Sequence, residues 1–300
     1  MYLIRGSNAI VGWVIVNRLN IYFAVVRKFI SVYITKSNVF DLLYKLEKQI
    51  FFNTNQIDYQ FLFENLPAYI LKLNSNCRKF DLFLAGSKHD GGYLIAKKYL
   101  KSDILVSAGI GKNCDFEVEM SKYCSRLILL DPTINALPKE VPNSIWIKKF
   151  LKSHSTRVSM NFSEIKRYYC DSKNSIILKI DIEGDEYEVL QEIDFKQINQ
   201  LIIEFHNFYR IVNTEFFTKL IKVFDTILGE FDIISINSNN FAEVNVFGNF
   251  LIPDVLEITF IKKNLVDQEK LVTLKEIAAH RANRLNYPTT IQFPMQITYD

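Results

Sequence analysis

Acidic side chains and a histidine stand at the ends of two successive apolar runs of the sequence. Asp181 and Glu183 end the first of these runs, and Glu204 and His206 end the next one along the chain. Residues two apart on an extended strand share one face, so the members of each pair point in the same direction. If the two runs are neighbouring strands, about 5 Å apart, all four side chains converge at one edge of a sheet.

Burying an unpaired charge costs free energy, so buried acids are expected either to have partners or to serve a function. Doubly wound α/β proteins bind their ligands at the carboxyl edge of the sheet, where these four side chains are expected. We therefore predict a functional site there, rather than a set of acidic helix caps. Three acids that follow, Asp185, Glu186 and Glu188, are expected to be charges of a first helical turn.

A glycine-rich turn lies upstream of this region. Ser107 ends an apolar run that continues into Gly109, Ile110 and Gly111 and then into a helical pattern. The glycines allow a tight turn and a close approach to a nucleotide, and the amides of the following helix point at the ligand. Asp131 closes the next apolar run, where a carboxylate can accept both hydroxyls of a ribose. This pattern predicts either S-adenosylmethionine or a dinucleotide as the cofactor.

The sequence favours S-adenosylmethionine over a dinucleotide. Cys114 occupies the position where the dinucleotide fingerprint requires a third small residue. Tyr93 and Lys97 resemble the Tyr/Lys pair of short-chain dehydrogenases, but they precede the glycine turn rather than lying far behind it. An NAD(P)-dependent sugar-modifying oxidoreductase is therefore the second hypothesis.

Seven short apolar runs alternate with helical patterns in the second two-thirds of the chain. Their near-continuous Ile, Leu and Val content is typical of strands buried on both faces, as in parallel sheets covered by helices. Residues 35–85 have apolar residues at helical spacing and are predicted to form a helical lead-in. The predicted strands are Asp103–Ala108, Arg126–Asp131, Ser144–Lys149, Ser175–Asp181, Gln200–Phe205, Phe231–Asn237 and Val255–Ile261.

Together these motifs resemble the FkbM-type methyltransferase family, in particular its branch with a DGGY motif. The resemblance extends from Asp90 to Ile261, and the strand end at Asp181 is its most specific part. The matching pieces are Asp90–Tyr93, Ser107–Gly111 with Phe116 and Glu117, Asp131–Thr133, Leu178–Leu190, Ile203–His206, Asn239 with Asn240, and Pro253–Glu257.

The resemblance implies a Rossmann-like class I methyltransferase. Its fold is an α/β fold with a seven-stranded, mostly parallel sheet and helices on both faces, here with an N-terminal helical appendage. We accordingly divide the chain into the appendage (residues 1–85), the methyltransferase domain (86–265) and a C-terminal extension (266–300). The resemblance also implies S-adenosylmethionine as the cofactor and O-methylation of a sugar hydroxyl, in polysaccharide or glycoconjugate biosynthesis.

The resemblance also assigns roles to residues of the site. Ser107 stands where many class I enzymes have an acid, so Asp90 is expected to contact the amino-acid end of the cofactor. The predicted catalytic residues are Asp181, Glu204 and His206. The predicted cofactor contacts are Asp90, Tyr93, Ser107, Gly109, Ile110, Gly111, Asp131 and Asp181, and the predicted acceptor contacts are Glu183, Asn239 and Asn240.

Methyl transfer to a hydroxyl requires an oxygen held in line with the methyl group and a group that takes the hydroxyl proton. His206, oriented by Glu204 or Asp181, is the predicted base. The alternative is Mg²⁺ or Mn²⁺, held by Asp181 and Glu204 with an asparagine from residues 237–240. We favour the base, because the histidine and the two acids already form an oriented acid–base set.

Charge and cysteine usage narrow the class of protein. Of the 36 basic residues, five lie in residues 1–40, which contain no acid, whereas residues 41–300 carry 31 basic and 33 acidic residues. A nearly neutral body argues against a broad nucleic-acid-binding face. The four cysteines lack the spacing of a zinc site and are expected to be reduced thiols of a cytoplasmic protein.

Residues 1–34 are strongly apolar, but Arg18, Arg27 and Lys28 interrupt them, and no uninterrupted run is long enough for a membrane-spanning helix. We expect this segment either to pack on the body or on a second subunit, or to lie on an anionic membrane surface at its cytoplasmic face. A third hypothesis for function follows from it, namely a scaffold that recruits a glycosyltransferase through the N-terminal helices.

Overall fold

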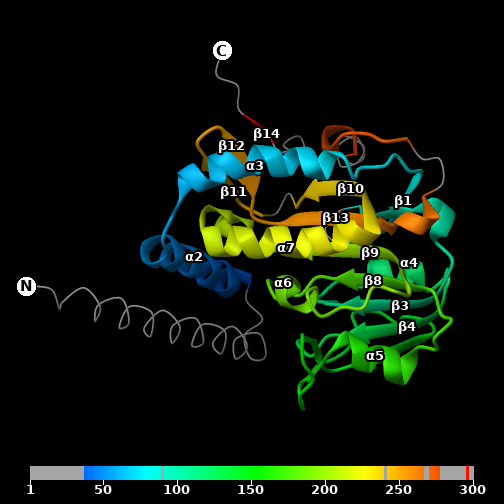
Figure 1. Ribbon diagram of the computed structural model, residues 1–300. Coiled ribbons are helices and arrows are strands. Elements are labelled where there is room, and N and C mark those ends of the chain that lie inside the picture. Colours follow the sequence, from blue (N-terminus) through cyan, green and yellow to red (C-terminus); the bar gives the residue numbers. More distant parts are fainter. Residues whose placement is uncertain (1–36, 89–90, 240–241, 267–269, 278–294, 297–300) are drawn as a thin grey trace, which may run out of the picture. The chain divides into compact units, whose positions relative to one another are not determined.

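The computed structural model describes residues 37–88, 91–239, 242–266, 270–277 and 295–296 (Figure 1). It contains two compact units, residues 1–58 and residues 59–300. The described part of the first unit is residues 37–58, which contain helix α2 (Ser37–Thr54). The segment 1–34, with its predicted packing or membrane contact, lies outside the described residues. The predicted domain boundaries at residues 85 and 265 stay predictions.

The second unit contains all the other described elements. Its helices are α3 (Tyr59–Asn74), α4 (Asp115–Met120), α5 (Phe162–Tyr169), α6 (Glu186–Val189) and α7 (Thr214–Glu230). Its strands are β1 (Leu82–Gly86), β2 (Gly92–Ala96), β3 (Ser102–Ala108), β4 (Cys124–Leu130), β5 (Ser144–Ile147), β6 (Phe150–Leu151), β7 (Ser159–Met160), β8 (Ile176–Ile180), β9 (Ile198–Phe205), β10 (Phe231–Ser238), β11 (Val244–Phe247), β12 (Phe250–Pro253), β13 (Leu256–Lys262) and β14 (Met295–Gln296).

Seven of these strands form one sheet with the order β10-β13-β9-β8-β3-β4-β5. The pairs from β9 to β5 are parallel, and β13 runs antiparallel to both of its neighbours. The chain moves outward from β3 in one direction and from β8 in the other, so the order reverses between these two strands, where α/β proteins bind ligands. The seven strands are those predicted from the apolar runs, and the sheet confirms the predicted class I methyltransferase fold.

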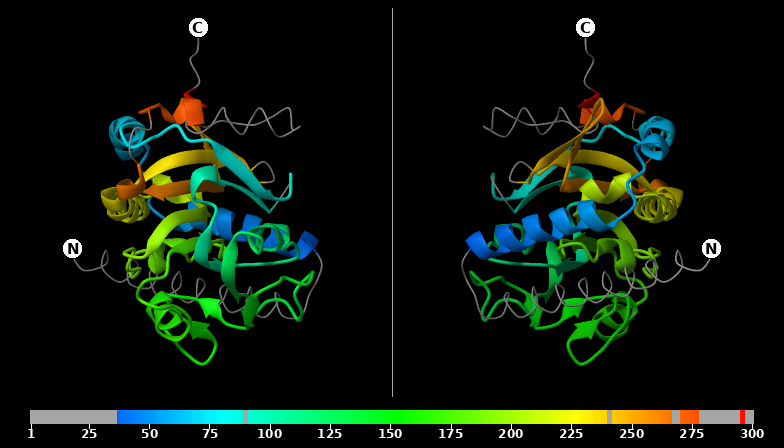
Figure 2. Two further views of the ribbon diagram at one scale, coloured as in Figure 1. Left: turned by 90° about the vertical axis from the view of Figure 1, so that its right-hand side faces the viewer. Right: turned by 90° about the vertical axis from the view of Figure 1, so that its left-hand side faces the viewer.

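Helices and a hairpin cover the two faces of the sheet. On one face, α7 packs through Phe224, whose ring stacks on Phe205 of β9 with ring centroids 4.9 Å apart. Helix α3 packs on α7, with the Tyr69 ring edge-on to Phe224. The other face carries α4 and the antiparallel β1–β2 hairpin. The Tyr93 ring of β2 contacts the Phe116 ring of α4 edge-on. Figure 2 shows α3 and α7 on one side of the sheet and the hairpin on the other.

The β1–β2 hairpin differs from the prediction, because residues 35–85 were expected to be helical throughout. Helix α3 ends at Asn74, and the apolar run Leu82–Gly86 is a strand. A short apolar run has too few residues for its period to distinguish a buried strand from a buried helix. Residues 82–86 form a strand because they pair with the antiparallel strand of residues 92–96.

Polar groups fix the hairpin to the sheet. The Thr259 hydroxyl donates to the carbonyl of Leu94 at 2.6 Å. The fully buried Gln200 amide accepts from the Ala96 N–H at 2.8 Å and donates to the carbonyl of Tyr99 at 2.7 Å. The hairpin therefore holds Tyr93 at a fixed place over the sheet. No helix in the part of the chain that the structure describes is long and apolar enough to cross a membrane.

Candidate active site

The glycine turn, residues 109–111, follows β3 at the carboxyl edge of the sheet. Gly109 has a φ of +84°, and a Cβ atom there would lie 1.6 Å from the carbonyl oxygen of Asp181, so no other residue fits. Gly111 has a φ of +61°, but a Cβ atom there would meet nothing within 4 Å. Gly109 is thus required by the close approach of the chain after β8, whereas Gly111 borders open space.

Asp131 follows β4 and holds the glycine turn. Its Oδ2 atom accepts from the amides of Ile110 at 2.9 Å and Gly111 at 2.8 Å. Its Oδ1 atom accepts from the amide of Thr133 at 2.7 Å and from the Thr133 hydroxyl at 2.6 Å. A carboxylate offers about four acceptor positions, and all are used here. A ribose hydroxyl, the predicted ligand of Asp131, must therefore displace or share one of these donors.

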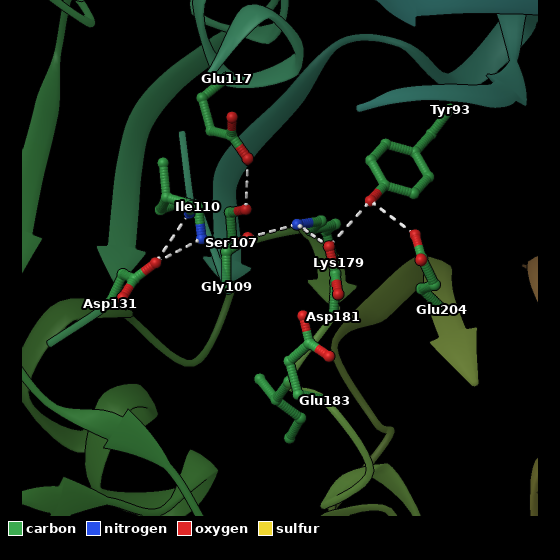
Figure 3. A network of polar contacts seen from close by, with 12 residues as sticks. Tyr93, Ser107, Gly109, Ile110, Glu117, Asp131, Lys179, Asp181, Glu183 and Glu204 are labelled. Carbon is green, nitrogen blue, oxygen red and sulfur yellow. Dashed lines mark hydrogen bonds and ion pairs between the residues drawn. The ribbon is translucent and has the colours of Figure 1, made fainter. Parts of the chain in front are cut away.

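Ser107 does not face the ligand side of the turn. Its side chain is fully buried and donates to Oε1 of Glu117 in α4 at 2.6 Å (Figure 3). Burial raises the pKa of Glu117 above its usual range. The side chain of Ser107 thus anchors β3 to α4, and its predicted cofactor contact stays a prediction. Asp90, expected to compensate for Ser107, lies outside the described residues.

Lys179, a residue of β8, links the glycine turn to Asp181. Its ammonium group donates to the carbonyl of Gly109 and contacts Oδ2 of Asp181 at 3.3 Å (Figure 3). Burial lowers the pKa of Lys179, but the carboxylates of Asp181, Glu117 and Glu204 raise it by more, so it lies above its usual range. A permanent positive charge thus stands between the turn and the acids.

Tyr93 of the hairpin bridges two acids of the site. Its hydroxyl lies 3.2 Å from Oδ2 of Asp181 and 3.2 Å from Oε2 of Glu204, and it donates to this pair (Figure 3). Burial, with both carboxylates, raises the pKa of the phenol well above its usual range. Tyr93 therefore stays a donor to the acids, and its predicted contact with the cofactor stays a prediction.

Glu204 is the penultimate residue of β9 and is almost fully buried. Its Oε1 atom accepts from the side-chain amide of Asn239 at 3.0 Å. Burial and the neighbouring Asp181 raise the pKa of Glu204 to about 7. Of the two asparagines predicted to contact the acceptor, Asn239 thus lies in the site, and Asn240 lies outside the described residues.

His206 faces three carboxylates with one ring nitrogen and a fourth with the other. Nε2 lies 3.9 Å from Oδ1 of Asp181, 3.7 Å from Oε2 of Glu183 and 3.7 Å from Oε1 of Glu204. These distances are too long for hydrogen bonds. Nδ1 lies 3.0 Å from Oε1 of Glu186, a fully buried residue. Burial lowers the pKa of His206, but Glu186 and Glu183 raise it well above its usual range.

The sequence prediction brought the right four side chains together but gave His206 the wrong orienting partners. Asp181, Glu183, Glu204 and His206, here named the histidine centre, converge from β8 and β9 as their spacing predicts. The hydrogen bond to the ring comes from Glu186, which we expected to be a first-turn charge. Because three acids follow one another in this stretch, the sequence carries no signal that singles out Glu186.

Lys179 and Glu117 also belong to the site, although the sequence predicted no role in it for either of them. Lys179 did carry a signal, since a lone lysine inside an apolar strand needs a buried partner. Glu117 belongs to a matching motif, but nothing in the sequence indicates that it accepts from Ser107.

The site offers room and donors for the expected groups. The open space at Gly111 and the adjacent Asp131 fit the ribose of an adenosyl cofactor. Asp181, Glu204 and His206 each offer one ligand atom, and these atoms lie within 4.8 Å of one another, a spacing that suits a divalent cation.

Comparisons with known proteins agree with this geometry. Residues 153–234 match the methyltransferase FkbM domain. This segment runs from before α5 into β10 and contains every member of the histidine centre, together with Lys179 and Glu186. No curated relative matches the chain.

Solved structures show only distant similarity. Fibrillarin, a pre-rRNA processing protein of Methanococcus jannaschii, is 11% identical over 55% of this chain and 68% of its own, with a TM-score of 0.35. The N-methyltransferase NodS of Bradyrhizobium japonicum is 11% identical over 54% of this chain and 86% of its own, with a TM-score of 0.32. An rRNA methylase of Streptococcus thermophilus is 12% identical over 54% of this chain and 87% of its own, with a TM-score of 0.31. Scores this low carry no argument, so the fold rests on the strand order.

The matched segment decides between the hypotheses for activity. It supports methyl transfer and gives no support to the predicted oxidoreductase alternative, while the DGGY branch stays a prediction. Residues 153–234 are thus similar to the methyltransferase FkbM domain, and the chain is an S-adenosylmethionine-dependent methyltransferase.

Proposed function

We propose that the chain transfers the methyl group of S-adenosylmethionine to a hydroxyl of a sugar or glycan. The observation that supports this is the histidine centre, in which Nε2 of His206 faces oxygens of Asp181, Glu183 and Glu204 beside the glycine turn. Carboxylates accept hydrogen bonds and do not donate them, so this centre favours an acceptor molecule rich in O–H donors. Sugars have such donors on neighbouring carbons.

The chain's own residues have separate tasks in this reaction. The cofactor, when bound, supplies an already activated methyl group. Asp181 and Glu204 accept from the hydroxyls of the acceptor and orient it, and Tyr93 and Lys179 hold these acids in place. In its neutral form, His206 takes the hydroxyl proton on Nε2, and the surrounding carboxylates stabilise the imidazolium that forms. Because these carboxylates raise the pKa of His206, turnover should increase as the pH rises and the ring loses its proton.

A divalent cation is the alternative means of activating the acceptor. Asp181, Glu204 and His206 would hold it, and it would supply a Lewis acid that lowers the pKa of the hydroxyl. Asn239 supports this alternative, because it already contacts Glu204. Asn237, from the same predicted stretch, donates instead to Ser235 at 2.9 Å.

Methyl transfer from a labelled cofactor to a panel of free sugars, nucleotide sugars and polysaccharides tests the proposal. The expected product is a methyl ether, identified by its carbon chemical shift. Methylation of nitrogen or carbon acceptors alone would contradict the assignment. Loss of activity in EDTA with recovery in Mg²⁺ or Mn²⁺ would establish the cation, as would a larger loss in Asp181→Asn than in His206→Ala. Asp171→Asn, at an exposed acid, is the matched control.

Contact of residues 1–34 with a membrane or a glycosyltransferase partner is proposed from their sequence alone. Most of these residues are apolar and all of the charged ones are basic, a composition that favours binding to an anionic membrane surface. Co-sedimentation of the full chain with anionic vesicles, and loss of it in a chain lacking residues 1–34, would support the membrane contact. Loss of self-association on truncation, measured by light scattering, would support a packing role.

A further inference from the structure

We infer that Glu186 is a positioning residue that fixes His206 with its proton on Nδ1 and with Nε2 turned to the acceptor. The inference deepens the proposed function and rests on it for the role of the ring. It assigns a task to a buried acid that does not touch the reacting atoms itself.

A single oxygen of Glu186 determines which nitrogen carries the proton. Oε1 accepts from the backbone amides of Ile182 at 3.0 Å and Gly184 at 3.2 Å. An oxygen with two amide donors is an acceptor, so the third group at this oxygen must donate as well. That group is Nδ1 of His206, at 3.0 Å. The neutral ring therefore carries its proton on Nδ1 and its lone pair on Nε2.

The same oxygen shapes the turn that carries Glu183. Glu183 has a φ of +59°, a left-handed conformation that a residue other than glycine adopts only with support from its surroundings, and Gly184 follows it with a φ of +108°. The two amide bonds to Glu186 supply this support on both sides of Glu183. Glu186 therefore sets the position of the exposed Glu183 carboxylate relative to Nε2, 3.7 Å away.

The neighbouring residue of α6 fixes the main chain of the histidine. The Tyr187 hydroxyl donates to the carbonyl oxygen of His206 at 2.7 Å. Glu186 and Tyr187 thus hold the ring and the backbone of His206 from one element. Asp181 and Glu204 cannot take this role, because their oxygens lie 3.9 and 3.7 Å from Nε2.

Nitrogen NMR of the wild-type protein, labelled at histidine, tests the inference, and a variant is needed only to assign the signals. The chain has four histidines, and the signals of His206 are those missing in His206→Ala. At a pH at which the ring is neutral, we expect the proton on Nδ1. A proton on Nε2 would overturn the inference. This result does not depend on the acceptor, so it stands even if no hydroxyl is methylated and the proposed function fails.

Kinetics of matched variants separate positioning from a purely structural role. Glu186→Ala should lower kcat by roughly 10–100-fold. Its affinity for S-adenosylhomocysteine should be unchanged, and its ring should lose the single tautomer. Glu186→Gln keeps an acceptor oxygen and should retain the Nδ1 proton and part of the activity. Glu188→Ala, at an exposed acid on the same helix that pairs with Lys219, should behave as wild type. Wild-type kcat in Glu186→Ala, or a lost tautomer in a folded Glu186→Gln, would overturn the inference.

Discussion

At the glycine turn, the Asp131 carboxylate accepts four hydrogen bonds, all from N–H and O–H groups of the chain itself. In the histidine centre, by contrast, oxygens of Asp181, Glu183 and Glu204 surround Nε2 of His206 at distances beyond hydrogen bonding. The acids there also outnumber the cations Lys179 and His206. Asp131 fixes the backbone of the turn through these bonds, whereas the histidine centre gathers several carboxylates around one ring nitrogen, an arrangement that suits an incoming donor or cation. We therefore expect the first region to hold the turn that binds the cofactor, and the second to bind the acceptor and react.

Removal of His206 should have the largest effect on activity. We expect His206→Ala to lower turnover by roughly 10²–10⁴-fold, because the proton acceptor is lost. Affinity for S-adenosylhomocysteine should stay the same, since the glycine turn is intact. His154→Ala, at an exposed histidine, is the control. Wild-type turnover in His206→Ala would place the base elsewhere and end the distinction between the two regions.

The two glycines of the turn provide a matched pair for stability. Gly109→Ala should destabilise the fold by about 3 kcal/mol or more, because its Cβ atom would overlap the Asp181 carbonyl in a left-handed conformation. Gly111→Ala should cost only about 1–2 kcal/mol, for the left-handed conformation alone. Chemical denaturation measures both.

Gly111→Ala should also weaken cofactor binding, because the new methyl group enters the open space next to Asp131. Equal stability losses in the two variants would mean that the close approach to Asp181 is not maintained in solution. Undiminished binding in Gly111→Ala would place the cofactor away from the turn.

Asp103 is a carboxylate outside both regions, and its substitution should have the smallest effect of the changes considered. It accepts from the amide of Ser175 at 2.7 Å and from its hydroxyl at 2.9 Å, and these bonds lower the pKa of Asp103. A lowered pKa means that the stabilisation is present above the unfolded value of about 4 and is lost as the pH falls through the folded value. Asp103→Asn should therefore cost less than about 1 kcal/mol at neutral pH and nothing in acid, since the site is exposed.

Unfolding measured between neutral and acidic pH checks this prediction, and turnover should not change. A stability difference that persists in acid would mean that charge is not the cause. A loss of activity would mean that Asp103 has a role in the reaction beyond its bonds to Ser175.

The strands of the sheet could be predicted because each is a separate apolar run, and the pairs at Asp181 and Glu204 followed from the two-residue period of strands. The β1–β2 hairpin could not, since its first strand is too short for its period to be recognised. The hairpin brings Tyr93 to Asp181 and Glu204, contacts that the sequence did not indicate. The partners of buried acids are set by tertiary contacts, and so the link from Glu186 to His206 became visible only in the structure.

Calorimetric titration of S-adenosylhomocysteine into Asp131→Ala and His206→Ala tests the division of the site most directly. Asp131→Ala removes both the bonds that fix the glycine turn and the oxygen that a ribose hydroxyl would share, and a hydrogen bond to a charged acceptor contributes about 1.5–3 kcal/mol. Binding should therefore weaken by at least about ten-fold. Asp131→Asn, which keeps one acceptor oxygen, serves as the second variant if the alanine form is unstable. His206→Ala should bind as the wild type does. Unchanged affinity in the folded Asp131 variants, or weakened affinity in His206→Ala alone, would contradict the account.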